Sequence, residues 1–137
     1  MKILVCVDGS EYSKKAVEYA SYFAKYYEAD VTLIRVIKSE KRREKPVFDE
    51  YGQEQRKTKE IIKEAKSIFS NIAPDVNTDS RIVVGPISSE IIRIAEDEEF
   101  ETIWIGTRGR TGVARMLLGS VADDVINYAH CPVVVVR

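Results

Sequence analysis

The chain has 137 residues, of which 45% are hydrophobic and 31% are charged. This length and composition predict one folded domain over residues 1–137 and exclude a disordered chain. With 21 Lys and Arg against 22 Asp and Glu, the net charge of -1 argues against broad binding to nucleic acid. No apolar run approaches the ~20 residues that a membrane-spanning helix needs.

The cysteine and histidine counts narrow the chemistry. Cys6 and Cys131 are the only cysteines, which excludes a disulfide scaffold and fits a reducing compartment. The opening apolar residues 1–5 are too few for an export signal, so a cytoplasmic location is expected. A single histidine, His130, excludes most multi-histidine metal sites.

The start of the chain predicts a strand, a helix and a second strand. Lys2–Val7 is a nearly continuous apolar run that ends at Asp8-Gly9-Ser10, which is typical of a buried strand. Ser10 can cap the helix that follows. The apolar face of that helix is expected to comprise Ala16, Val17, Ala20, Phe23, Ala24 and Tyr27. Val31–Ile37 is predicted to be the second strand.

The middle of the chain begins with the polar segment Lys38–Lys59, whose role the sequence leaves open. Its first half, which contains Pro46, is expected to be an irregular excursion, and a helix follows. The inner face of that helix is predicted to carry Ile61, Ile62, Ala65, Ile68 and Phe69. Arg81–Val84 is the third predicted strand, closed by Gly85-Pro86.

The last part of the chain continues the alternation. Ile87–Glu99 is a predicted helix, and Thr102–Ile105 is a fourth strand that glycines interrupt. Ser120–Ala129 is a fourth predicted helix, and Val133–Val136 is a fifth strand. The apolar side of the fourth helix is expected to carry Val121, Val125 and Tyr128.

Alternating strands and helices predict an α/β protein with one open, parallel, five-stranded sheet and helices on both faces. Right-handed crossovers favour the strand order 3-2-1-4-5, numbered along the chain. The carboxyl ends of strands 1 and 4 are then neighbours at a topological switch point, where ligands of such sheets bind. Asp8 and Gly106 follow those two strands, so the site is predicted there.

A glycine-rich segment, Gly106–Gly112, follows the fourth strand, and Gly119-Ser120 opens the last helix. Glycine lets the backbone approach a ligand, and successive amides at a helix N-terminus can hold phosphate. The Ser120 hydroxyl can donate to a phosphate or simply cap the helix. An ordinary glycine-rich turn with solvated arginines remains the alternative. Neither a P-loop nor a G-x-G-x-x-G dinucleotide fingerprint is present.

The spacing Gly106-x2-Gly109-x9-Gly119-Ser120 resembles the G-x2-G-x9-G-[S/T] signature of the ATP-binding branch of the universal stress protein family. The resemblance covers the whole chain, from the strand before Asp8-Gly9-Ser10 to the closing residues 131–136. It implies a Rossmann-like fold of the adenine nucleotide alpha hydrolase type. It also implies ATP as the ligand, with or without Mg²⁺.

The resemblance further implies which residues contact ATP. Asp8 would accept hydrogen bonds from the ribose, Val7 would lie beside the nucleoside, and the Val36 backbone would meet adenine. The ribose and phosphate path would be lined by Ile105, Gly106, Arg108 and Gly109. The phosphates would be received by Gly119, Ser120, Val121 and Ala122. Ala122 departs from the Ser or Thr of many relatives, which removes one side-chain donor.

Other conspicuous residues have simpler interpretations. Asp8 could instead cap the first helix or finish a turn. Cys6 and Trp104 are expected in the core, and His130 lies at a helix end that favours positive charge. The run Lys41-Arg42-Arg43 is flanked by glutamates, which favours a solvated loop. The sequence therefore assigns no catalytic residue and no metal ligand.

The leading hypothesis is an ATP-binding stress-response or signalling module without strong catalysis of its own. The alternative is a slow ATPase or phosphotransferase, for which the sequence offers no evident base and no carboxylate pair for Mg²⁺. A phosphoacceptor receiver domain is excluded, because the third strand ends in Val84-Gly85 instead of Asp. The sequence does not identify a protein partner.

A homodimer through Val133–Val136 is also expected. In the order 3-2-1-4-5 this strand lies at the sheet edge, and four uninterrupted valines form a template for antiparallel pairing with a second copy. The family resemblance implies the same arrangement. A loop that covers the edge is the alternative.

Overall fold

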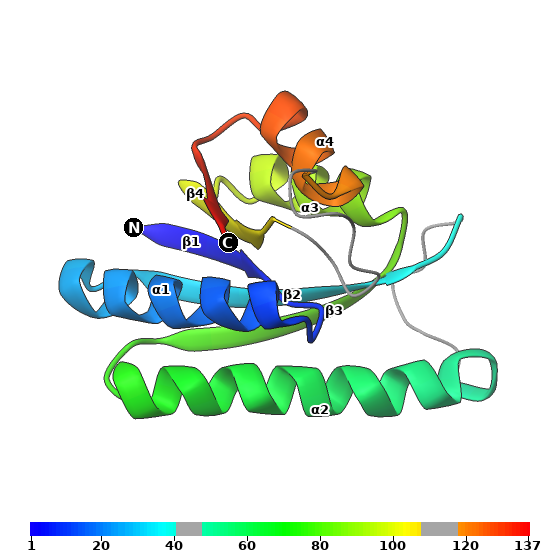
Figure 1. Ribbon diagram of the computed structural model, residues 1–137, viewed down its shortest axis with the longest axis horizontal. Coiled ribbons are helices and arrows are strands. Elements are labelled where there is room, and N and C mark those ends of the chain that lie inside the picture. The colour runs from blue at the N-terminus through cyan, green and yellow to red at the C-terminus, as the bar shows by residue number, and fades with distance from the viewer. Residues whose placement is uncertain (41–47, 108–117) are drawn as a thin grey trace.

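Strands and helices alternate along the part of the chain that the structure describes (Figure 1). The computed structural model describes residues 1–40, 48–107 and 118–137, with residues 48–53 described by their backbone alone. In chain order the elements are β1 (Lys2–Cys6), α1 (Glu11–Tyr27), β2 (Asp30–Lys38), α2 (Phe48–Ile72), β3 (Thr78–Gly85), α3 (Ile87–Asp97), β4 (Thr102–Gly106), α4 (Ser120–Tyr128) and β5 (Val133–Val136).

The sheet has five parallel strands in the order β3-β2-β1-β4-β5, which confirms the predicted class and strand order. Leu4 pairs with Thr32 of β2 and with Ile103 of β4, so β1 lies at the centre. From β1 the chain adds β2 and β3 on one side and then returns to add β4 and β5 on the other. The carboxyl ends of β1 and β4 therefore meet where the winding reverses.

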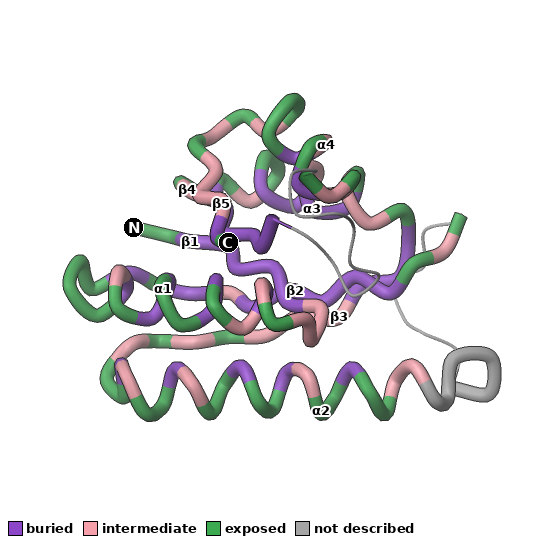
Figure 2. Tube along the Cα trace, viewed as in Figure 1, coloured by how far each residue is buried: buried purple, intermediate pink, exposed green. Residues whose placement is uncertain are grey.

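Helices cover both faces of the sheet: α1 and α2 lie on one face, and α3 and α4 lie on the other (Figure 1). Successive side chains of a strand point to opposite faces, so each strand supplies two cores. In β1, Ile3 and Val5 pack with α1 and α2, whereas Leu4 and Cys6 pack with α3 and α4. Figure 2 shows that the central strands are buried, whereas the outer surfaces of the helices are exposed.

Two of the predicted strand and helix boundaries differ from the structure by more than a single residue. β3 begins at Thr78, before the predicted start at Arg81, because residues 78–80 pair with β2 at the outer edge of the sheet. Polar residues can form an edge strand without any apolar run that reveals it. α3 ends at Asp97, and Glu99, the predicted last residue, has a left-handed φ of 56°.

Two tyrosines are exposed where the sequence predicted burial. Tyr27 is 56% exposed and packs on Phe23 with ring centroids 4.6 Å apart, so it does not complete the apolar face of α1. Tyr128 is 72% exposed, and α4 buries Ala122 and Val125 instead. Both tyrosines are the last residues of their helices, where the phenol hydroxyl can stay hydrated.

The second half of the polar segment belongs to α2, which begins at Phe48. Its inner face is the predicted one, with Ile62, Ala65 and Phe69 buried against the sheet. Burying a side chain such as Phe69 typically contributes about 1.5–3 kcal/mol, so this face is sufficient to hold the helix in place. Within the described ranges, no helix is both long and apolar enough to cross a membrane.

Candidate functional site

The predicted site lies where β1 and β4 end side by side. Directly after β1, Val7 donates its amide to Ile34 O at 2.9 Å. Directly after β4, Thr107 donates its amide to Val136 O at 2.8 Å and accepts the Gly119 amide at 2.7 Å. These bonds bring the β1–α1 turn, the end of β4 and the first turn of α4 to one edge of the sheet.

Asp8 is held by a hydrogen-bond network within the β1–α1 turn. Its amide donates to Ser13 Oγ at 3.0 Å, and its Oδ1 accepts the Ser10 amide at 2.8 Å. Ser10 Oγ accepts the Ser13 amide at 3.1 Å and caps α1, as predicted. Asp8 therefore does close a turn. The described residues use only one of its carboxylate oxygens, which leaves the other able to accept from a ligand.

Gly106 has a structural role that the sequence motif does not reveal. A Cβ at this position would lie 2.8 Å from the Tyr12 carbonyl carbon and 3.0 Å from the Ser13 amide nitrogen. The first turn of α1 therefore packs directly on the backbone at the end of β4. This close approach holds the Asp8 network beside β4 and explains the glycine without any ligand.

The first turn of α4 has amides without a helical partner. Gly119 is the N-cap residue, with φ -63° and ψ 151°, so the prediction that Ser120 could be the cap is wrong. The first intrahelical bond runs from the Asp123 amide to Gly119 O at 2.9 Å. The amides of Ser120, Val121 and Ala122 precede that bond and have no partner among the described residues, as is typical of the donors that helix N-termini present to anions.

Three predicted contacts can be made only by the backbone. The side chains of Val36 and Ile105 are buried in the core beneath α3 and α4, and the Ala122 methyl belongs to the same core. The last β2 residue that pairs with β1 is Ile34, so the Val36 backbone extends beyond the end of β1. Two further predicted contacts, Arg108 and Gly109, lie outside the described residues.

The described residues carry no feature of a redox or metal centre. Cys6 is buried in the core, as predicted. Desolvation, with the Asp8 charge as a second cause, holds the pKa of the Cys6 thiol far above its ordinary value, so the thiol stays protonated. Among these residues, no three His, Cys, Asp or Glu side chains are grouped in a way that could hold a metal ion.

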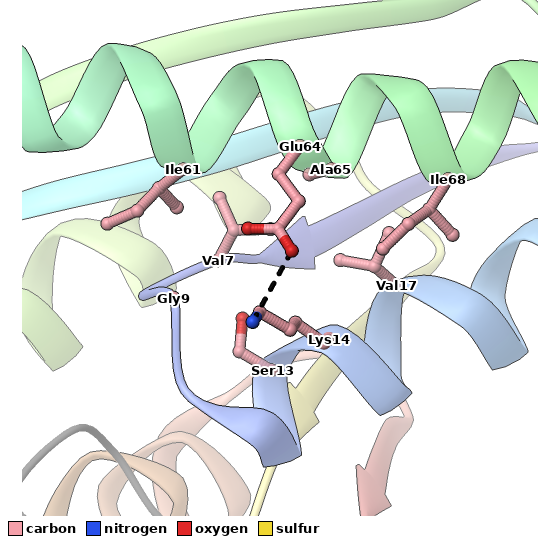
Figure 3. A pocket seen from close by; sticks show the side chains of 9 residues that line it. All are labelled: Val7, Gly9, Ser13, Lys14, Val17, Ile61, Glu64, Ala65 and Ile68. Atoms are coloured by element: carbon pink, nitrogen blue, oxygen red, sulfur yellow. Dashed lines mark ion pairs between the residues drawn. The ribbon is translucent and has the colours of Figure 1, made fainter.

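A cavity of about 240 Å³ opens beside the Asp8 turn. It is lined by Asp8, Gly9, Lys57, Glu60, Ile61 and Glu64. The α2 residues in this wall were not predicted, although their spacing places them along one side of a helix. A much smaller cavity lies between α1 and α2, where Lys14 and Glu64 form an ion pair of 3.3 Å (Figure 3).

An ion pair with a buried arginine joins α2 to the sheet close to that cavity. Arg35 Nη2 of β2 donates to Glu54 Oε1 of α2 at 2.7 Å, and the Arg35 side chain is only 8% exposed. Thr58, one helical turn further along α2, is completely buried. A buried arginine is costly without its partner, so the pair favours this position of α2. The signal for it in the sequence is one arginine inside an apolar strand.

The universal stress protein family matches the chain over residues 1–137. Universal stress protein MJ0531 from Methanocaldococcus jannaschii is 35% identical over 99% of this chain and 81% of that protein. The solved structure of MJ0577 from the same organism is 34% identical, covers 98% of this chain and 94% of its own, and has a TM-score of 0.73. A universal stress protein solved in complex with cAMP has a TM-score of 0.81. Its identity is 22% over 100% of this chain and 97% of its own, so that likeness concerns the fold alone.

Proposed function

This chain belongs to the universal stress protein family, and we propose that it binds ATP between β1 and β4 as a nucleotide-dependent stress-response or signalling module. One observation carries the proposal. A carboxylate fixed by its own turn, at Asp8, stands at the same edge of the sheet as the unpaired amides of the first turn of α4. The first group suits a ribose diol and the second suits phosphate.

In this proposal, different residues contact the sugar, the base and the phosphates of the nucleotide. Asp8 accepts from the ribose hydroxyls, Val7 lies beside the nucleoside, and the Val36 backbone meets adenine where β2 extends beyond β1. Ile105 and Gly106 form the floor between sugar and phosphates at the end of β4. The phosphates, with any Mg²⁺ they carry, reach the first turn of α4. That turn contains Gly119, Ser120, Val121 and Ala122. Arg108 and Gly109 are part of the proposed path on the family motif alone.

Replacing Asp8 with alanine is expected to weaken ATP binding by about 1.5–3 kcal/mol, roughly 10- to 150-fold, as for hydrogen bonds to a charged group. Calorimetric titration measures the loss. Asp8→Asn keeps an oxygen that can accept the Ser10 amide, so it separates the turn from the ligand contact. 2′-Deoxy-ATP lacks one donor and should lose less affinity than ATP on either substitution. Unchanged ATP affinity in both variants would remove Asp8 from the site.

ATP hydrolysis by the isolated chain is expected to be slow. Phosphoryl transfer needs a group that orients the attacking water and cations that offset the developing charge. Neither a Walker lysine nor an evident base occurs in the sequence. Release of phosphate from ATP and Mg²⁺ by purified protein is the measurement. Turnover in the ordinary enzymatic range of ~1–10³ s⁻¹ would favour the alternative function, an ATPase or phosphotransferase.

We further propose a homodimer through β5, supported by its place at the sheet edge. Val133, Val134 and Val135 are only half-buried within one copy. The carbonyls of Pro132 and Val136 face β4, so in a parallel ladder the amides of Val133 and Val135 face outward. Two such edges related by a two-fold axis can pair antiparallel.

Substituting Val135 with proline therefore tests the dimer without removing a bond to β4. An edge strand tolerates proline where the amide faces solvent, so the variant should fold but fail to pair. Light scattering is expected to give a dimer for the wild type and for Val135→Thr, which keeps the amide, and 15.6 kDa for Val135→Pro. A wild type of 15.6 kDa at high micromolar concentration would contradict the proposal.

A further inference from the structure

We propose that the cavity beside Asp8 favours nucleotides whose ribose hydroxyls are free over nucleotides that carry an additional, separate phosphate group on one of them. This inference rests on the proposed ATP site. It specifies the ligand class further, as adenine nucleotides whose charge is confined to the 5′ side of the sugar. The argument depends on the size, charge and hydrogen-bonding capacity of the cavity wall.

The cavity has room for part of a nucleotide. Its volume of about 240 Å³ is below the roughly 300–1,000 Å³ that pockets for whole small-molecule ligands enclose. It opens beside Asp8 on the α2 side, whereas the unpaired amides of α4 belong to the segment that is bonded to Thr107 after β4. We call the α2 residues that line the cavity, Lys57, Glu60, Ile61 and Glu64, the α2 wall. A nucleotide bound through Asp8 thus places its sugar next to the α2 wall and its 5′ phosphates toward α4.

The charges that line the cavity disfavour the binding of a phosphate group. Among the described residues, three carboxylates line the cavity, those of Asp8, Glu60 and Glu64, against one ammonium group, that of Lys57. The Glu64 charge is shared with Lys14 at 3.3 Å. Glu60 is exposed and has no ion-pair partner among the described residues. Like charges repel, and the repulsion weakens with added salt.

The hydrogen bonding of Asp8 gives the same preference. An ionised carboxylate only accepts, so it needs a donor on the ligand. A free ribose hydroxyl is such a donor. A phosphate on that oxygen removes the donated proton and puts an anion in its place. A phosphorylated ribose therefore loses a favourable contact with Asp8 and gains an unfavourable one.

Contacts on both sides of the cavity hold α2 in its position over the Asp8 turn. Arg35 fixes Glu54 at 2.7 Å, one turn before Lys57, and Lys14 joins α1 to α2 through Glu64. Between these two ties α2 packs on the sheet through Ile62. Accommodating an extra phosphate by tilting α2 would have to break the Arg35–Glu54 contact and the packing of Ile62, together with the half-exposed Lys14–Glu64 pair.

Three ligands separate the two effects: ATP, 3′-deoxy-ATP and 3′-phospho-ATP. ATP and 3′-deoxy-ATP differ by one hydrogen-bond donor, whereas 3′-deoxy-ATP and 3′-phospho-ATP differ by the added phosphate. Calorimetric titration at low salt is expected to give about tenfold weaker binding for 3′-deoxy-ATP than for ATP. The 3′-phospho-ATP is expected to bind about tenfold more weakly again than 3′-deoxy-ATP. Higher salt should reduce this second gap, the difference in affinity between 3′-deoxy-ATP and 3′-phospho-ATP.

Two charge-reversal variants identify the α2 wall as the source. Glu60→Lys should reduce the gap between 3′-deoxy-ATP and 3′-phospho-ATP by about three- to tenfold, while the gap between ATP and 3′-deoxy-ATP stays the same. Glu96→Lys makes the same charge change on an exposed residue near the end of α3, at the opposite edge of the sheet, and should leave both gaps unchanged.

The outcomes are distinguishable from failure of the ATP site itself. If ATP binds and 3′-phospho-ATP binds as tightly as 3′-deoxy-ATP, the selectivity is refuted and the proposed function stands. If the second gap exists but Glu60→Lys and Glu96→Lys affect it equally, the α2 wall is not its source and the inference is overturned. If ATP itself does not bind to the folded chain, the proposed function fails and this inference fails with it.

Discussion

Gly106→Ala should lower the free energy of unfolding by about 1–3 kcal/mol, the usual cost of forcing an extra group into a packed interior. The new Cβ would stand 2.8 Å from the Tyr12 carbonyl carbon and 3.0 Å from the Ser13 amide nitrogen. Both atoms belong to the backbone of α1, so no side-chain rotation can relieve the contact. Urea denaturation followed by circular dichroism measures the change, and Gly106→Val should cost more.

The matched control is Gly119→Ala, a glycine of the same motif with an ordinary φ of -63°. Alanine fits that backbone without strain, so the control should lose at most about 1 kcal/mol through the weaker N-cap. If the Gly106 variant unfolds at the same urea concentration as the wild type, α1 does not pack on Gly106 in solution as closely as described.

Gly119→Val is expected to weaken ATP binding by at least about 100-fold while the chain stays folded. Any L-residue adopts its φ and ψ, so the backbone conformation does not have to change when valine replaces glycine. A branched side chain at the N-cap would shield the amides of Ser120 and Val121 from phosphate. Titration calorimetry gives the affinity, and a denaturation curve for the same sample confirms the fold.

Gly119→Ala provides a graded comparison, since its smaller methyl group should weaken binding less than valine does. The Gly106 variants are thus expected to lose stability, whereas Gly119→Val is expected to lose affinity for ATP. Wild-type affinity in Gly119→Val would mean that the phosphates do not lie at the first turn of α4. The Asp8 contact would then have to be assigned independently of that turn.

The order of the fold could be predicted because buried parallel strands appear in a sequence as apolar runs. Lys2–Val7 and Val133–Val136 are such runs, and the structure contains strands at both places. The start of β3 at Thr78 could not be predicted, because an edge strand needs few apolar side chains. Tyr27 fits the helical spacing of an apolar face, but only the packed structure reveals that its side chain is exposed.

The part of the candidate site nearest the switch point could be predicted for a topological reason. Once the strand order is given, residues after β1 and β4 must be neighbours, and Asp8 and Gly106 are. The α2 wall could not be predicted in this way. Lys57 and Glu60 have the spacing of any solvated helix face, and nothing local indicates that α2 passes over the Asp8 turn. That placement depends on contacts between residues far apart in sequence, such as Arg35 and Glu54.

The packing of α1 on Gly106 limits what the presence of this glycine in a related protein indicates about ligand binding. A descendant that had lost its nucleotide would still need glycine at this position, because the Tyr12 backbone leaves no space for any other residue. Natural selection for folding alone would then preserve the first glycine of the signature. Its presence in a distant relative would be inherited architecture and would carry no information about ligand binding. The φ of Gly119 is one that any L-residue adopts, so its retention or loss would be the more informative record of whether that relative still holds phosphate.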